Sequence, residues 1–166
     1  MMRIRPALLL AASLLLHIPE AAAMSPLSFF QRVERVGLLC AVDADGGTAA
    51  GLADEALCGR AAAVLSGLLA SGPAVTALAP NDARIADPAT LLLLVHATLR
   101  PEDKGQDGRL LSLAATLQRT GSAGGPPFFM MPPQALALSG SLDESLLDSM
   151  LHRLLGPLAR ALRANP

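Results

Sequence analysis

The two cysteines, Cys40 and Cys58, are the residues best suited to covalent chemistry, because they are the only thiols of the chain. Their spacing is far from the Cys-x-x-Cys pattern of redox motifs, and no histidine is adjacent to either of them. A catalytic pair is therefore disfavoured, and two buried free thiols are the other alternative. We expect a structural disulfide, which would close a loop of about 18 residues and contribute roughly 3 kcal/mol to stability.

His96 is the second candidate for chemistry. A catalytic triad would need a serine activated by His96 and oriented by an acid, but the sequence has no Gly-x-Ser-x-Gly elbow to present that serine. His152 follows Asp148 by four residues, which is the spacing of a pair on one helix face, whereas zinc would need a third ligand. His96 therefore stays a weak candidate site. We assign no catalytic or metal-ligating residue and expect no cofactor.

The segment Asp43-Ala44-Asp45-Gly46 begins like a calcium-binding loop. An EF-hand places an oxygen ligand fifth, a glycine sixth and a glutamate twelfth, and here Gly47, Thr48 and Asp54 occupy those positions. We therefore interpret these aspartates as turn-forming and helix-start residues. The glycine pairs of the sequence do not continue into a phosphate-binding loop either.

Phe128, Phe129, Met130 and Met131 form an apolar cluster with no obvious position in a core. Proline pairs flank the cluster on both sides. Methionine adapts its shape and phenylalanine supplies contact area, so the cluster suits a loop that docks on a partner or a membrane. Apolar runs this short are more often buried, and an edge strand that closes the core is the interpretation we favour.

The first 23 residues have the layout of a secretory signal peptide. Arg3 and Arg5 form a charged start, Ala7 to Leu16 an apolar run, and Ala21 to Ala23 a small-residue exit. We expect cleavage between Ala23 and Met24, so that 1–23 is the signal peptide and 24–166 is a single small exported α+β domain. Export would place the cysteines in an oxidising compartment, either the periplasm or the outside of the cell.

Composition excludes several classes of partner. Loss of Arg3, Arg5 and Glu20 with the signal peptide changes the formal net charge from −1 to −2, and no basic run is present. Tryptophan and tyrosine are absent, which argues against ligands that stack on aromatic rings. We therefore expect no nucleic-acid partner. No later segment has the roughly 18 uninterrupted apolar residues of a spanning helix, so we expect no transmembrane segment after cleavage and a soluble mature protein.

Hydrophobic periodicity predicts an α+β two-layer sandwich. A mostly antiparallel sheet of four or five strands would carry two helices on one face, because only one face of the central hairpin is fully apolar. The predicted elements are a strand over 32–42, a helix over 50–70, strands over 74–79, 90–100, 109–119 and 135–139, and a final helix that starts at a Ser141–Glu144 capping box and should kink or split at Gly156-Pro157.

This order of elements is similar to that of small accessory domains in bacterial cell-envelope assemblies, although no motif identifies a family. The function we expect is a non-enzymatic envelope protein that binds a partner protein. Two alternatives stay open: a small exported hydrolase or metal-dependent enzyme that uses His96, and a carrier of an apolar ligand. A carboxylate or a second histidine within reach of His96 would favour the enzyme, and a solvent-facing His96 beside an open apolar surface would favour the binding protein.

Overall fold

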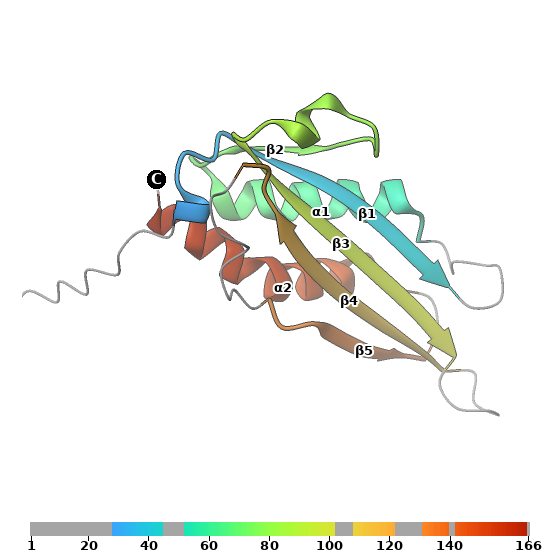
Figure 1. Cartoon of the computed structure of the whole chain (residues 1–166). Coiled ribbons are helices and arrows are strands. Elements are labelled where there is room, and N and C mark those ends of the chain that lie inside the picture. The colour runs from blue at the N-terminus through green and yellow to red at the C-terminus, as the bar shows by residue number, and fades with distance from the viewer. Residues whose placement is uncertain (1–27, 45–51, 102–107, 122–130, 140–141, 166) are drawn as a thin grey trace, which may run out of the picture.

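Five strands form one sheet, and two helices pack on one of its faces (Figure 1). The computed structural model describes residues 28–44, 52–101, 108–121, 131–139 and 142–165. The predicted signal peptide and the residues Phe128 to Met130 lie outside this part of the chain. The elements are β1 (Arg35–Ala44), α1 (Asp54–Leu69), β2 (Ala74–Ala77), β3 (Thr90–Pro101), β4 (Arg109–Gln118), β5 (Gln134–Leu138) and α2 (Glu144–Ala164), with short 3-10 helices η2 (Ser28–Phe30) and η3 (Ala83–Ala86).

The strand order is β2-β1-β3-β4-β5. Strand β1 is parallel to both β2 and β3, whereas β3 and β4, and then β4 and β5, are antiparallel. The predicted α+β fold and the β3–β4 hairpin are confirmed, but the sheet is mixed rather than mostly antiparallel. The reason is the path of the chain: α1 is the crossover that parallel neighbours require, and residues 78–89 return the chain to the end of the sheet where β1 starts.

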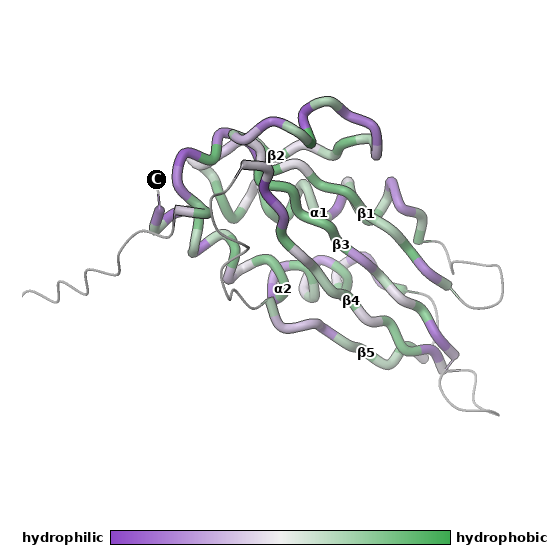
Figure 2. Tube along the Cα trace, in the orientation of Figure 1, coloured by the Kyte–Doolittle hydropathy of each residue, from purple (hydrophilic) through white to green (hydrophobic). Residues whose placement is uncertain are grey.

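The helix-covered face of the sheet holds the core. Side chains that alternate inward from β1, β3 and β4 meet the apolar stripes of the two helices in one cluster. Figure 2 shows hydrophobic residues along the middle of the sheet and hydrophilic ones at its ends and connections. The spacing of Leu57, Ala61, Val64, Leu65 and Leu68 in the sequence predicts one buried stripe on α1, and the first four are buried while Leu68 is partly buried. The same spacing on the final helix predicts that Leu146 is buried, and this is wrong, because Leu146 is 40% exposed.

Helix α2 begins two residues later than the cap we predicted. Asp143, rather than Ser141, is its N-cap, and the Asp143 carboxylate accepts a hydrogen bond from the backbone N–H of Ser145. Glu144, which a capping box would use for the cap, forms an ion pair with Arg60 of α1 instead. The helix continues through Pro157 without splitting, because the leucines around this proline are buried in the core and hold both halves in place.

Candidate functional site

The face of the sheet opposite the helices carries the sequence's weak candidate, His96. In β3, Val95 and Ala97 point toward the helices, so His96 between them points to the other face, which we call the open face. The strand register places His96 opposite Ala41 of β1 and opposite Ala114 of β4. The small alanines leave His96 exposed. The predicted orientation of His96 on the wetter strand face is therefore confirmed by the burial pattern.

A shallow hollow of about 400 Å³ surrounds His96 on the open face. Most of the side chains around it are apolar or small, so its surface offers contact area rather than hydrogen-bonding groups. The six open-face residues that line it are Leu39, Ala41, Leu94, His96, Ala114 and Thr116. Leu110 lies further along the same face of β4 and is 41% exposed.

Residues 78–89 cover the remaining part of this face. Leu78 lies directly over Gly37 of β1, where an added Cβ would come within 2.4 Å of the Leu78 Cδ1 atom. A larger residue at this position would therefore require the Leu78 side chain to move. The helix η3 in this segment contacts β3, and Leu92 of β3 is buried at 5% exposure. The open face is thus closed near the start of β1 and β3 and accessible further along the strands.

The surroundings of His96 do not assemble a hydrolase or metal site from the described residues. On this face, Asp43 lies opposite Thr98 in the register, and its carboxylate is bound by Arg100 at 2.9 Å. Ser112 lies opposite Thr98, so hydroxyl groups are near His96, as the predicted hairpin register implied. No group of three or more potential metal ligands gathers anywhere in the described part of the chain. The arrangement favours contact with an apolar surface.

Cys40 and Cys58 are joined by a disulfide with their Cα atoms 5.5 Å apart. Cys40 points from β1 toward the helices and Cys58 belongs to α1, as the sequence predicts. The bond therefore fixes the helix layer to the sheet. Nearby, the Asp54 carboxylate at the start of α1 accepts a hydrogen bond from the backbone N–H of Val42 at 2.8 Å. Asp54 stands in the first turn of α1, as predicted, and this contact joins the start of the helix to β1.

His152 lies on the exposed side of α2. Its Nδ1 atom is 2.9 Å from the backbone carbonyl oxygen of Asp148, while the Asp148 carboxylate binds Arg60 at 3.2 Å. The spacing of Asp148 and His152 suggested a contact between their side chains, and this prediction is therefore wrong. Sequence reasoning missed the alternative pairing, because Arg60 is distant in the chain and only the packing of α1 on α2 brings it close.

Met131 is the described member of the predicted contact cluster. It is 8% exposed and belongs to the core. Phe128, Phe129 and Met130 lie outside the described residues, so the choice between an edge strand and a contact loop stays a prediction.

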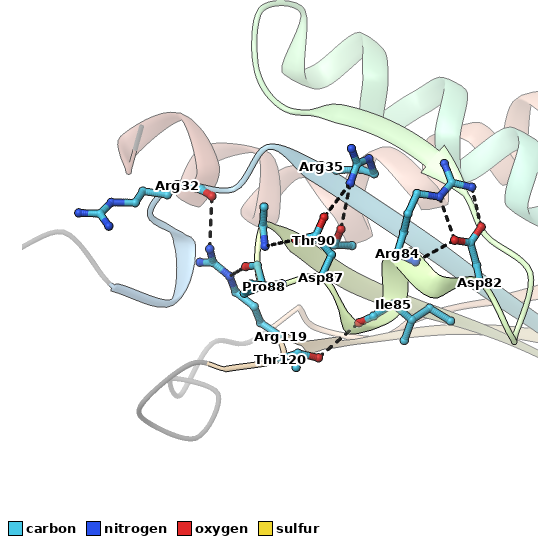
Figure 3. A network of polar contacts seen from close by, with 11 residues as sticks. Arg32, Arg35, Asp82, Arg84, Ile85, Asp87, Pro88, Thr90, Arg119 and Thr120 are labelled. Atoms are coloured by element: carbon cyan, nitrogen blue, oxygen red, sulfur yellow. Dashed lines mark hydrogen bonds and ion pairs between the residues drawn. The ribbon is translucent and has the colours of Figure 1, made fainter.

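Arg119, directly after β4, holds the start of the domain in place (Figure 3). Its guanidinium donates hydrogen bonds to the backbone carbonyl oxygens of Phe29 at 2.7 Å, Gln31 at 2.8 Å and Pro88 at 2.8 Å. Five donors in a planar fork suit arginine to several carbonyls at once. The sequence gives no signal for this contact, because an arginine after a strand is usually a solvated residue.

Asp82 caps η3, beside the open face. Its carboxylate accepts hydrogen bonds from the side chain of Arg84 and from the Arg84 backbone N–H (Figure 3). These bonds lower the pKa of Asp82 to about 2, and the bond from the Arg84 side chain has the larger effect. The charges of Asp82 and Arg84 neutralise each other, and we assign the pair a structural role.

Comparison with known proteins identifies the fold but no family. The sequence matches no known protein family and no curated protein. Among solved structures, a PelC dodecamer from Paraburkholderia phytofirmans is similar with a TM-score of 0.51 and 14% identity, over 76% of this chain and 89% of that one. A minor lipoprotein from Acinetobacter baumannii is a weaker match, with a TM-score of 0.31 and 15% identity, over 80% and 92%. The comparison with PelC therefore supports the fold described above.

Proposed function

We propose that this chain is an exported, non-enzymatic protein of the cell envelope, and that its open face binds another protein chain. One observation carries the proposal: the uncovered part of the sheet around His96 is a hollow lined by leucine, alanine and threonine. A strand face left to solvent is normally polar. An apolar face without a covering layer is typical of a contact surface. The signal-peptide layout and the disulfide support the exported part of the proposal.

The occupant that we favour is a second copy of this chain. The similar PelC structure is a dodecamer, which supports self-association as a use of this fold. Ala41 and Ala114 beside His96 are short, so two such faces have room to approach closely. The mature chain carries a formal charge of only −2 after loss of Arg3, Arg5 and Glu20, which leaves little long-range repulsion between copies.

Multi-angle light scattering of the mature chain from Met24, over a range of concentrations, tests this proposal. Ala114→Glu puts a carboxylate into the hollow, and association would have to remove that charge from water. We expect the dissociation constant of the self-associated species to rise at least tenfold. A mature chain that is monomeric at every concentration would overturn self-association.

Two leucines of equal exposure supply a matched control. Leu110 on the open face is 41% exposed, and Leu146 on α2 is 40% exposed. Leu110→Glu should weaken self-association, and Leu146→Glu should leave it unchanged. Both variants replace a leucine with a glutamate, so they differ only in the face that carries the change. Thermal unfolding by circular dichroism confirms that both variants fold. Equal effects of the two substitutions would show that the open face is not the contact surface.

A further inference from the structure

Four arginines from three separate segments gather at one end of the molecule, which we call the arginine end. They are Arg32 after η2, Arg119 after β4, and Arg160 and Arg163 in the last two turns of α2. Arg119 donates a hydrogen bond to the backbone carbonyl oxygen of Arg32 at 3.3 Å. The sequence shows no basic run because these residues are far apart in the chain.

The packing of the elements brings the α2 arginines to the same end. Arg163 donates a hydrogen bond to the backbone carbonyl oxygen of Leu68, in the last turn of α1. After α1 the chain enters β2, whose first residue, Ala74, pairs with Arg35 at the start of β1. Figure 1 shows η2 beside the C-terminal end of α2, and Figure 3 shows the Arg32 side chain directed away from the protein.

Charge at this end is unbalanced. Neighbouring arginines are neutralised, since Arg35 pairs with Asp87 at 3.3 Å and Arg84 pairs with Asp82. Within the described residues, by contrast, Arg32 and Arg160 have no carboxylate partner, and Glu34 is an exposed acid two residues after Arg32. The acids that begin the helices lie at the opposite end of the molecule, and these are Asp54, Glu55, Asp143 and Glu144.

We propose that the arginine end binds the anionic headgroups of a membrane. A guanidinium forms paired hydrogen bonds with phosphate oxygens, so Arg32 and Arg160 suit a phospholipid surface. Arg119 and Arg163 donate hydrogen bonds to backbone carbonyl oxygens and add positive charge at the same end. The helix η2 (Ser28–Phe30) lies at this end, and Arg119 binds the carbonyl groups of Phe29 and Gln31. The apolar run from Ala7 to Leu16 precedes this point, so a leader held in the membrane during export would turn the arginine end toward the headgroups.

This inference rests on the exported location in the proposed function, but not on self-association. No helix of the described residues is both long and apolar enough to cross a bilayer, and the proposed contact is with the membrane surface. A net-negative protein is repelled by an anionic surface as a whole. Binding would therefore depend on the local excess of arginine and would fix the orientation of the domain.

Flotation of the mature chain with vesicles tests the proposal. Vesicles of phosphatidylcholine with 30% phosphatidylglycerol should bind the protein, and vesicles of phosphatidylcholine alone should not. Removal of one arginine near an anionic surface weakens binding about fivefold, so Arg32→Gln and Arg160→Gln should each show this loss. Binding should fall as salt is raised, because ions screen these contacts.

Arg109→Gln is the matched control, because it removes the same charge from an exposed position at the opposite end, the start of β4. It should leave the bound fraction unchanged. Equal losses for Arg109→Gln and Arg32→Gln would overturn the proposal, as would binding to neutral vesicles or no binding at all. Free glycerol phosphate at millimolar concentration should not compete, and competition would indicate a small-anion site instead. Light scattering of the same variants separates these outcomes from failure of self-association.

Discussion

The two faces of the sheet use the same strands and differ in what lies over them. Leu93 and Leu113 on the helix-covered face are completely buried. Their neighbours in the chain lie on the open face, where Leu94 is partly buried and Ala114 is exposed. The disulfide and both helices are on the covered side. On the open side, residues 78–89 are the one described segment that provides cover, and they cover one end.

This difference shows that the hydrophobicity of the strands alone does not decide which face is buried. Both faces contain leucine, but the amphipathic helices have one apolar stripe each, and the covered face is where those stripes meet long side chains. The open face has alanines on both sides of His96, and none of the described helices fills the hollow. An apolar region that the fold leaves uncovered is available for contact with another molecule.

Alanine substitutions at Leu93 and Leu94 give the largest expected contrast between the two faces. Leu93→Ala should lower the free energy of unfolding by about 3 kcal/mol, because it leaves a cavity among fully buried side chains. Leu94→Ala should cost less than about 1 kcal/mol, because water and neighbours can occupy the space. Urea unfolding followed by circular dichroism measures both. Equal losses would mean that the open face is covered by part of this same chain.

Loss of the disulfide on the covered side should lower the free energy of unfolding by as much as Leu93→Ala or by less. Cys40→Ala and Cys58→Ala should each lower stability by roughly 3 kcal/mol, since either one opens the loop between β1 and α1. The double variant should lose no more than either single variant, because the bond is already absent in both. Strictly additive losses in thermal unfolding would contradict a stabilising bridge. Self-association through the open face should survive in all three variants.

The elements of the fold are largely readable from the sequence, while their arrangement is only partly so. Strict alternation predicted β3 and β4 to within about one residue at their ends, and it oriented His96 and Cys40. The parallel pairing of β1 with β3 was not predicted, because it depends on the path of residues 78–89. No local sequence pattern indicates that path. The cap of α2 was misplaced because Ser141 and Asp143 both have a suitable oxygen, and tertiary contacts decide between them.

The candidate surfaces were less predictable than the elements. The hollow exists because Leu78 covers Gly37 but not the part of the face beyond it, and this is a tertiary contact. The arginine end brings together residues from the beginning, the middle and the end of the chain. Arg119 in particular reads as an ordinary surface residue until its carbonyl partners are known. Long-range packing, rather than residue type, creates these surfaces.

The smallest expected difference between the two sides of the sheet is in their loss of stability at low pH. Asp143 caps α2 on the covered side, and hydrogen bonds from the backbone N–H and hydroxyl of Ser145 lower its pKa. Asp82 caps η3 on the open side, where Arg84 lowers its pKa from 3.8 to about 2. A carboxylate with a lowered folded pKa adds stability above its unfolded pKa, and this stability is lost as pH falls toward the folded value.

The melting temperature should therefore decline as the pH falls from 3.8 to about 2. Asp82→Asn and Asp143→Asn keep an oxygen acceptor at each cap but cannot titrate, so each should remove part of this decline. Circular dichroism at several pH values measures the slope for each variant. Because Asp143 is exposed and Asp82 is only partly buried, the changes should be small, and a decline that is unchanged in both variants would assign the acid sensitivity to other carboxylates. A larger change for Asp143→Asn would show that the helix layer, rather than η3, limits the stability of the sheet in acid.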